Sequence, residues 1–253
     1  MKTLIAANWK MHGDLSWRAK PNAFRRAYGV PTHGKNSGVD ILICPPSHMI
    51  CALVDGAKGH DIHIGGQNCH QAETGAFTGE ISANMLADCG ATYVIVGHSE
   101  RRAIFGETDS MVAEKADSAI TAKLVPIICV GESREQRESG QADEVVGDQL
   151  KSSIPASANG DTLVIAYEPV WAIGTGLVPT LDDIAAMHDH IRGILSTRFG
   201  DEKAQTIQIL YGGSVKPSNA KDILALTDVN GALIGGAGLD MESLCAIAQA
   251  VEG

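Results

Sequence analysis

The sequence has neither an apolar stretch long enough to cross a membrane nor an excess of basic residues. Its longest apolar runs, such as Leu124–Val130, are far shorter than the roughly 18–20 residues that a spanning helix needs. The first apolar run breaks at Asn8, which is not typical of a secretory signal. Lys and Arg number 20 against 30 Asp and Glu, a formal net charge of −10. This balance argues against a general nucleic-acid or anionic-membrane surface, so we expect local positive potential to hold any anionic substrate.

The sequence also lacks the common signatures of disulfide, metal and dinucleotide sites. None of its six cysteines forms a C-x-x-C pair, and in a long chain with no predicted signal peptide we expect reduced, mostly buried thiols and a cytoplasmic location. His60 with His63, and His188 with His190, lie close in sequence, but no carboxylate or cysteine pattern completes a ligand set. No G-x-G-x-x-G occurs. We therefore predict no metal and no dinucleotide cofactor.

What the chain does contain is a regular alternation of short apolar runs and helix-length stretches. It has 253 residues, 44% of them hydrophobic and 20% charged, which is an ordinary globular balance. The predicted strands are Leu4–Asn8, Val39–Cys44, Ile62–Gly66, Tyr93–Gly97, Val125–Val130, Leu163–Tyr167, Ile207–Leu210 and Ala232–Ile234. Eight βαβ-type units in about 250 residues predict an α/β fold, a single closed (β/α)₈ barrel domain over residues 1–253. A doubly wound open sheet is the alternative.

Capping residues and spacing place several of the helices. The predicted helices with the clearest signals are Thr108–Leu124, Thr180–Phe199, Pro217–Leu226 and Asp240–Val251. Thr180 stands three residues before Asp183, a spacing that predicts an N-terminal cap, and Gly200 stands where that helix would stop. The stretch from His12 to Gly38 is interrupted by Pro21, Pro31 and several glycines and gives no clear prediction.

Polar residues stand where three of the apolar strands end, and in a barrel the chemistry is expected there. Because side chains alternate between faces, Asn8 and Lys10 should point together and Trp9 away. Glu168 should share a face with Val164 and Ala166. Each of these residues alone would be read as an ordinary surface group, and it is their common position that favours a site.

The fourth strand is followed by Gly97, His98 and Ser99. His98 should share a face with Val94 and Val96, and Ser99 is expected to cap a short helix. A helix N-terminus disfavours a positive charge, so we expect His98 to be neutral and to act as a hydrogen-bond donor. The alternative is a capped strand-to-helix turn without function.

Glycines follow the seventh and eighth strands, in Tyr211–Ser214 and Gly235–Gly238. Glycines let backbone N–H groups approach an oxyanion, and a phosphate site made by these two loops recurs in barrels. The loop after Glu168 mixes apolar residues with glycines, which is typical of a lid that buries a ligand under Trp171 and Ile173.

At these residues the sequence closely resembles the triosephosphate isomerase family over essentially its whole length. The stretches that carry the resemblance are AANWKM at Ala6–Met11, GAFTGEIS at Gly75–Ser82, YVIVGHSERR at Tyr93–Arg102, AYEPVWAIGTG at Ala166–Gly176, ILYGGSVKP at Ile209–Pro217 and ALIGGA at Ala232–Ala237.

The resemblance implies roles for particular residues. Glu168 matches the family's catalytic base, His98 its electrophile, and Lys10 and Asn8 its substrate-contacting positions. The positions that match the phosphate-holding groups are Gly174, Ser214, Gly235 and Gly236. The residues that match the mobile lid are Pro169, Val170, Trp171, Ala172, Ile173, Thr175 and Gly176. The segment Gln67–Thr78 matches a loop that inserts into a second subunit, which implies a homodimer with Thr78 reaching the partner's site.

The implied reaction interconverts dihydroxyacetone phosphate and glyceraldehyde 3-phosphate through an enediolate, without a cofactor. Alternatives that stay open are a paralogue acting on a longer ketose phosphate, a non-catalytic phosphate-binding barrel and another phosphate-binding barrel such as a Schiff-base aldolase. One departure from the family pattern is Leu177 and Val178, where a basic residue and Thr are usual. Because these residues stand at the end of the lid, we expect altered lid kinetics.

Overall fold

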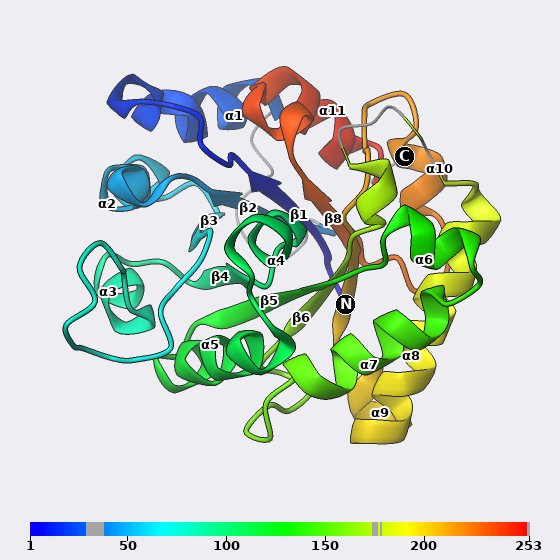
Figure 1. Cartoon of the computed structure of the whole chain (residues 1–253). Helices are drawn as coiled ribbons and strands as arrows, with labels where there is room; N and C mark the ends of the chain where they lie inside the picture. The colour runs from blue at the N-terminus through cyan, green and yellow to red at the C-terminus, as the bar shows by residue number, and fades with distance from the viewer. Residues whose placement is uncertain (29–37, 174–176, 178, 252–253) are drawn as a thin grey trace.

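The chain folds into a closed barrel of eight parallel strands surrounded by helices (Figure 1), as a computed structural model shows. The structure describes residues 1–28, 38–173, 177 and 179–251. The strands follow one another around the barrel in sequence order, and β1 pairs in parallel with both β2 and β8. The predicted (β/α)₈ architecture is confirmed, and the open-sheet alternative is wrong because the first and last strands are hydrogen-bonded to each other.

Each predicted strand is confirmed to within one residue at either end. The strands are β1 (Thr3–Asn8), β2 (Val39–Cys44), β3 (Ile62–Gly66), β4 (Tyr93–Val96), β5 (Val125–Val130), β6 (Val164–Tyr167), β7 (Gln208–Tyr211) and β8 (Gly231–Ile234). Their nearly continuous apolar sequences follow from burial on both faces, one toward the barrel axis and one toward the helices.

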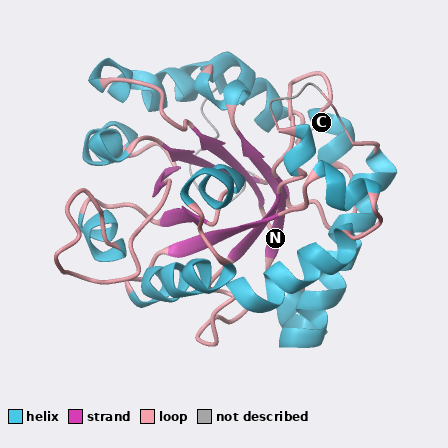
Figure 2. Ribbon diagram, in the orientation of Figure 1, coloured by secondary structure: helices cyan, strands magenta, loops and turns pink. Residues whose placement is uncertain are grey.

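Helices cover the outside of the barrel (Figure 2). The α-helices are α1 (Lys20–Tyr28), α2 (Ile50–Ala57), α3 (Ala83–Asp88), α4 (Ser99–Phe105), α5 (Asp109–Thr121), α6 (Arg134–Glu138), α7 (Ala142–Ser153), α8 (Leu181–Phe199), α9 (Asp201–Ala204), α10 (Ala220–Leu224) and α11 (Met241–Gln249). The short 3₁₀ helices are η1 (Leu15–Ala19), η2 (Ser47–Met49), η3 (Val170–Ala172) and η4 (Gly236–Leu239).

For two of the predicted helices, α8 and α10, the structure tests the residue at which the sequence predicts the helix to begin. The Thr180 cap of α8 is confirmed: its side chain accepts from the backbone of Asp183, whose carboxylate accepts in return. The start of α10 at Pro217 is wrong, because the helix begins only at Ala220. The side chain of Asn219 instead accepts from the backbone N–H of Lys216 and donates to the carbonyl of Ser214, so this segment forms a turn.

The apolar side chains form two separate layers. A small cluster lies inside the barrel and includes Leu4, Ile95 and Ala166. A larger cluster lies between the strands and the helices and includes Val94 and Val96. A side chain at a strand end therefore belongs either to the inner layer, which opens into the barrel mouth, or to the outer layer, which packs against helices.

Within the described part of the chain, no helix is both long enough and apolar enough to span a bilayer.

Candidate active site

A cavity of about 260 Å³ lies at the carboxyl ends of the strands. Its lining brings together residues from five separate strand ends or the loops that follow them: Asn8, Lys10, His98, Glu168, Ile173, Gly212, Gly213, Ser214, Val215, Lys216, Leu233, Ile234, Gly235, Gly236 and Ala237. Every residue predicted from the sequence to contact substrate lines this one cavity, except Gly174, which lies outside the described residues.

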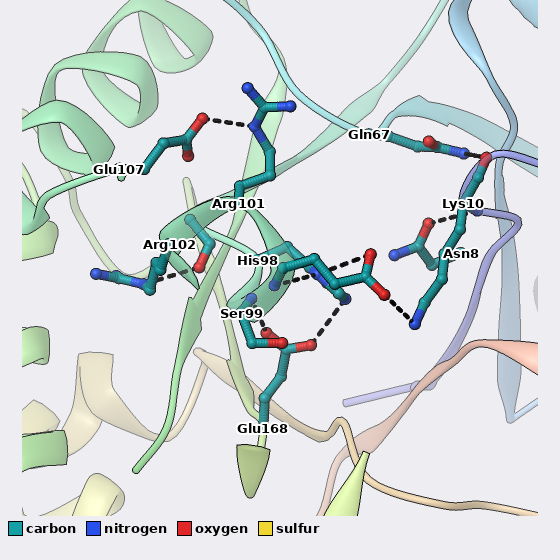
Figure 3. A network of polar contacts seen from close by, with 11 residues as sticks. Asn8, Lys10, Gln67, His98, Ser99, Arg101, Arg102, Glu107 and Glu168 are labelled. Atoms are coloured by element: carbon teal, nitrogen blue, oxygen red, sulfur yellow. Dashed lines mark hydrogen bonds and ion pairs between the residues drawn. The ribbon is translucent and has the colours of Figure 1, made fainter. Parts of the chain in front are cut away.

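The end of β1 presents Asn8 and Lys10 to the cavity. Lys10 has a φ of 51°, an uncommon value for a residue with a side chain, and its backbone N–H donates to Asn8 Oδ1 at 3.0 Å. Gln67 directly follows β3, and its side-chain amide donates to the Lys10 carbonyl at 2.8 Å (Figure 3). This hydrogen bond holds the backbone of Lys10 in place. Trp9 points the other way and packs edge-on against Trp17. The predicted alternation is confirmed.

The ammonium group of Lys10 is directed across the cavity mouth toward α4. It donates to Glu100 Oε1 at 2.6 Å, with both side chains partly exposed to solvent. An exposed ion pair of this kind adds little to the free energy of unfolding. Its consequence for the site is that the positive charge of Lys10 lies near His98 (Figure 3).

The end of β4 places His98 by a turn of the backbone. Gly97 has a φ of +66°, and a β-carbon there would lie 2.6 Å from Val112 Cγ2. The left-handed backbone at this glycine ends the alternation of the strand, so His98 enters the cavity although Val94 and Val96 lie in the outer layer. The prediction that these three side chains share a face is therefore wrong. The predicted cap is also wrong by one residue, because His98 itself caps α4.

The end of β6 places Glu168, whose carboxylate is almost completely buried at 2% exposure. Its Oε1 lies 2.9 Å from His98 Nε2, and its Oε2 accepts from the backbone N–H of Ser99 at 2.9 Å (Figure 3). Burial alone would raise its pKa, but His98, the Ser99 N–H and the Cys129 thiol together leave the pKa of Glu168 below its ordinary value. The group is thus a carboxylate at neutral pH despite its burial.

The two nitrogen atoms of His98 have different partners. Nδ1 accepts from the backbone N–H of Glu100 at 3.2 Å, so its lone pair is in use, and Nε2 is left to donate to Glu168. Burial lowers the pKa of His98, but the charge of Glu168 and the hydrogen bond with it outweigh that effect and raise the pKa. A second proton would have to displace the Glu100 N–H from Nδ1. The hydrogen bonds therefore fit the neutral Nε2–H tautomer while Glu168 remains charged.

The glycines after β7 and β8 let the loops at these two strand ends pass close to Glu168 and Lys10. A β-carbon at Gly212 would lie 2.8 Å from Glu168 Cγ, and one at Gly235 would lie 3.5 Å from Lys10 Cε. Behind this wall, the Trp9 ring N–H donates to the Gly238 carbonyl at 3.0 Å. The glycines thus leave the cavity open on this side, where Ser214, Gly235 and Gly236 line it.

The first residues of the predicted lid are held in place by hydrogen bonds to Glu132. Val170–Ala172 form η3, and the Trp171 ring N–H donates to Glu132 Oε1 at 2.8 Å, as does the Tyr167 hydroxyl at 3.1 Å. Ile173 lines the cavity, whereas Trp171 is held to Glu132. Of the other predicted lid positions, Thr175, Gly176 and the neighbouring Val178 lie outside the described residues.

A second, larger cavity of about 580 Å³ adjoins the first and opens to the surface. It shares Asn8, Lys10 and His98 with the first cavity, and its outer part is lined by Met11, Ile104 and Phe105, all well exposed. The predicted partner loop lies at the same side of the molecule, and residues 73–80, Thr78 included, are exposed to solvent.

Comparison with known proteins identifies the family. The family model described as triosephosphate isomerase matches residues 3–251. The chain belongs to the triosephosphate isomerase family. It is 50% identical over 251 residues to triosephosphate isomerase of Ruegeria pomeroyi, covering 99% of this chain and 98% of the relative. It is 52% identical over 250 residues to that of Afipia carboxidovorans, again covering 99% and 98%. The crystal structure of triosephosphate isomerase from Bartonella henselae superposes with a TM-score of 0.91 at 41% identity, with both chains covered completely. The protein is thus an isomerase enzyme.

The contacts of several residues around this cavity were not predicted from the sequence, although Gln67 was named there as the start of the partner loop. Gln67, Glu100, Cys129 and Glu132 all contact a predicted site residue or its backbone. Glu100 stands within the quoted YVIVGHSERR stretch and could have been found there. Gln67 and Glu132 follow strand ends, which is the signal used for Asn8 and Glu168. Nothing in the local sequence distinguishes Cys129 from a buried apolar residue.

Among the residues that the structure describes, no group of three or more His, Cys, Asp or Glu side chains is arranged to hold a metal ion.

Proposed function

We propose that this isomerase interconverts dihydroxyacetone phosphate and D-glyceraldehyde 3-phosphate through an enediolate, using Glu168 as base and neutral His98 as electrophile. The observation that carries the proposal is the pairing of a buried, ionised carboxylate with a histidine 2.9 Å away in a cavity that also presents Lys10 and two glycine loops. The combination of a glutamate base and a neutral histidine at a helix N-terminus is the arrangement known for this family.

The first step is removal of a proton from the carbon next to the substrate carbonyl. Glu168 can accept this proton because the lowered pKa keeps it ionised, and its burial leaves little water to compete. A positioned general base contributes roughly 10²–10⁴ in rate. As the carbon loses its proton, the electron pair moves toward the carbonyl oxygen and negative charge develops there.

His98 and Lys10 stabilise the negative charge that develops on the carbonyl oxygen. The Nε2–H of His98, now donating to Glu168, donates to the substrate oxygen instead once substrate enters, and then moves protons between the two oxygens. Lys10 offsets the enediolate charge from the β1 side, with Asn8 holding its backbone. A preorganised donor at an oxyanion contributes about 10²–10³ in rate.

The phosphate group is held away from the reacting carbons by Ser214 and the backbone of Gly235 and Gly236, joined by Gly174 from the lid. Binding energy from this non-reacting group drives closure of the segment that starts at Pro169. Closure excludes water, which strengthens the electrostatic terms and protects the enediolate from losing phosphate. No step requires a metal or cofactor.

The proposal includes a homodimer of single-domain chains in the cytoplasm, with no nucleic-acid or membrane partner. The loop Gln67–Thr78, which is exposed over residues 73–78, and the cavity lined by Met11, Ile104 and Phe105 are suited to fit against each other in two copies of the chain. A second copy would cover this apolar surface and bring its Thr78 toward Lys10 and Asn8.

A coupled assay of glyceraldehyde 3-phosphate turnover tests the proposal. We expect fast turnover that falls by roughly 10²–10⁴ in Glu168→Gln, a variant that keeps the shape of the side chain but removes the base. Glu138→Gln, on an exposed side chain of α6, is the matched control and should leave turnover unchanged. Little activity in the unmodified protein, or higher kcat/KM with a tetrose phosphate, would overturn the assignment.

A further inference from the structure

A pair of cysteines lies outside the proposed active site, where the start of α2 meets the end of α3. Cys51 is in the first turn of α2 and is exposed, and Cys89 directly follows α3 and is half-buried. The two thiols are close enough to hydrogen-bond to each other. They come from segments separated by β3 and the long loop after it, so only the fold brings them together.

The packing around the pair fixes this proximity. Gly90, next to Cys89, has a φ of +91°, and a β-carbon there would lie 2.8 Å from Val54 Cγ1. Val54 stands three residues after Cys51, so both lie on the same face of α2, the face that meets the turn at Cys89. The Cys89 backbone N–H donates to the Met85 carbonyl at 3.2 Å, which holds the turn to α3.

The pair also differs from the other cysteines in exposure. Cys44, Cys69, Cys129 and Cys245 are buried, and Cys129 contacts Glu168 in the site already described. The cavity that faces the proposed partner subunit is lined by Ile50 and Leu86, the inward neighbours of this region, and its lining includes neither Cys51 nor Cys89. Cys51 is exposed in the folded chain, so an oxidant in solution can reach its thiol there.

We propose that Cys51 and Cys89 are a modification site, at which an oxidised low-molecular-weight thiol such as glutathione disulfide converts them to a reversible disulfide that ties α2 to the end of α3.

The reaction is ordinary thiol–disulfide exchange in two steps. The Cys51 thiolate attacks one sulfur of glutathione disulfide, which forms a Cys51–glutathione mixed disulfide and releases one glutathione thiolate. The Cys89 thiolate then attacks Cys51 Sγ, forms the protein disulfide and releases the second glutathione. Two protein thiols are oxidised, one glutathione disulfide is reduced to two glutathione molecules, and the two protein protons pass to the released thiolates.

The order of attack follows from exposure and charge. Cys51 is the more exposed residue, so we expect its thiol to meet the oxidant first. The hydrogen bond with Cys51 raises the pKa of Cys89 to about 11, so Cys89 stays protonated until its neighbour has been modified. Formation of the mixed disulfide removes that hydrogen bond and leaves Cys89 next to an electrophilic sulfur.

The covalent ring would enclose the whole segment from α2 through β3 and the Gln67–Thr78 loop to α3. A closed loop of this length restricts the unfolded chain, so the oxidised protein should unfold at a higher temperature than the reduced protein. For a chain of this size we expect Tm to rise by roughly 5 °C or more, and to return to its original value on reduction.

The linkage is tested on the purified full-length protein, equilibrated with mixtures of reduced and oxidised glutathione, quenched in acid and alkylated. Cyanogen bromide cleaves after Met49 and Met85, and trypsin cleaves after Lys58 and Arg101, so the two cysteines fall on separate fragments, 50–58 and 86–101. We expect a species that joins these two fragments, lighter by two hydrogens than their sum and lost on reduction.

Serine variants show whether the pair is responsible. Cys51→Ser and Cys89→Ser should each abolish both the linked fragments and the rise in Tm, whereas the buried Cys245→Ser, the matched control, should retain both. Linkage of Cys51 to another cysteine or between two chains would overturn the proposal. So would glutathione remaining on Cys51 in the unmodified protein at every ratio of the two glutathione forms.

Discussion

The ends of β4 and β6 deliver two facing groups to the same cavity by opposite means. At β6, Val164 and Ala166 point into the barrel and Glu168 continues their alternation into the mouth. At β4, Val94 and Val96 point outward, and His98 reaches the mouth only because the chain turns at Gly97. Side-chain alternation thus predicts the face of a residue only as far as the first left-handed residue.

The supports of the two groups differ in the same way. Glu168 is held through its own carboxylate, by His98 and the Ser99 N–H. The ring of His98 also has hydrogen-bond partners on both nitrogens, but its entry into the cavity depends in addition on the backbone at Gly97, whose carbonyl accepts from Arg102 Nε at 2.8 Å. Changes to side-chain length should therefore act most at β6, and changes to backbone freedom most at β4.

The largest effect is expected from shortening the side chain at β6. Glu168→Asp keeps the charge but withdraws the carboxylate by about one bond, and a misplacement of roughly 1 Å can cost about 10² in rate. We expect kcat to fall by about that factor with KM little changed, measured in the coupled assay. A fall of less than threefold would show that the carboxylate position is not fixed by the strand end as argued.

A smaller effect is expected from a change of backbone at β4. Gly97→Ala places a β-carbon 2.6 Å from Val112 at a φ of +66°, so the turn must shift and carry His98 with it. We expect kcat to fall by roughly 10-fold, since the ring should move by less than 1 Å.

The chain supplies a matched control for this change. Gly106 has nearly the same φ, +67°, but a β-carbon there meets nothing within 4 Å. Gly106→Ala should cost about 1 kcal/mol in unfolding free energy and leave kcat unchanged. Equal kinetics for the two variants would remove the special role given to Gly97.

A third change weakens the support behind that turn. Besides Gly97, Arg102 contacts the Cys129 carbonyl at the end of β5 and the Ser153 hydroxyl, each at 3.1 Å, and pairs with Asp109. The planar guanidinium of Arg102 contacts all four partners at once. A lysine at this position would keep the positive charge, but its single ammonium group could not contact all four. For Arg102→Lys we expect a few-fold loss in kcat and about 2 kcal/mol in unfolding free energy, measured by the assay and urea titration. Unchanged urea midpoint and kcat would contradict this.

The contrast also explains what the sequence could predict. Strand positions and the barrel follow from apolar runs and their alternation, and these are read locally. The position of Glu168 follows in the same way, whereas the positions of His98 and of the α4 cap depend on the φ of Gly97, which composition does not specify. The contacts of Gln67 with Lys10 and of Glu132 with Trp171 join segments far apart in the chain, so no window of sequence contains both partners.

The smallest effect on turnover is expected from His188, which supports the β6 end from outside. Its ring is buried edge-on against Tyr167, and its Nδ1 donates to the Asp228 carbonyl at 3.0 Å. Burial lowers the pKa of His188 to about 4, below the ordinary value of 6.5. Between these values the unfolded chain binds a proton that the folded chain does not, so this contribution to stability is complete above pH 6.5 and is lost as pH falls toward 4.

His188→Gln removes the titrating ring from this position in α8. Its unfolding free energy should be lower than that of the unmodified protein at pH 7, because the ring's packing is lost, but should fall less between pH 7 and pH 5, by about 2 kcal/mol. Urea titrations at the two pH values measure this difference, and kcat at pH 7 should change less than in Glu168→Asp, Gly97→Ala or Arg102→Lys, since the ring does not line the cavity. Parallel pH dependence in the two proteins would mean that a group other than His188 destabilises the fold in acid.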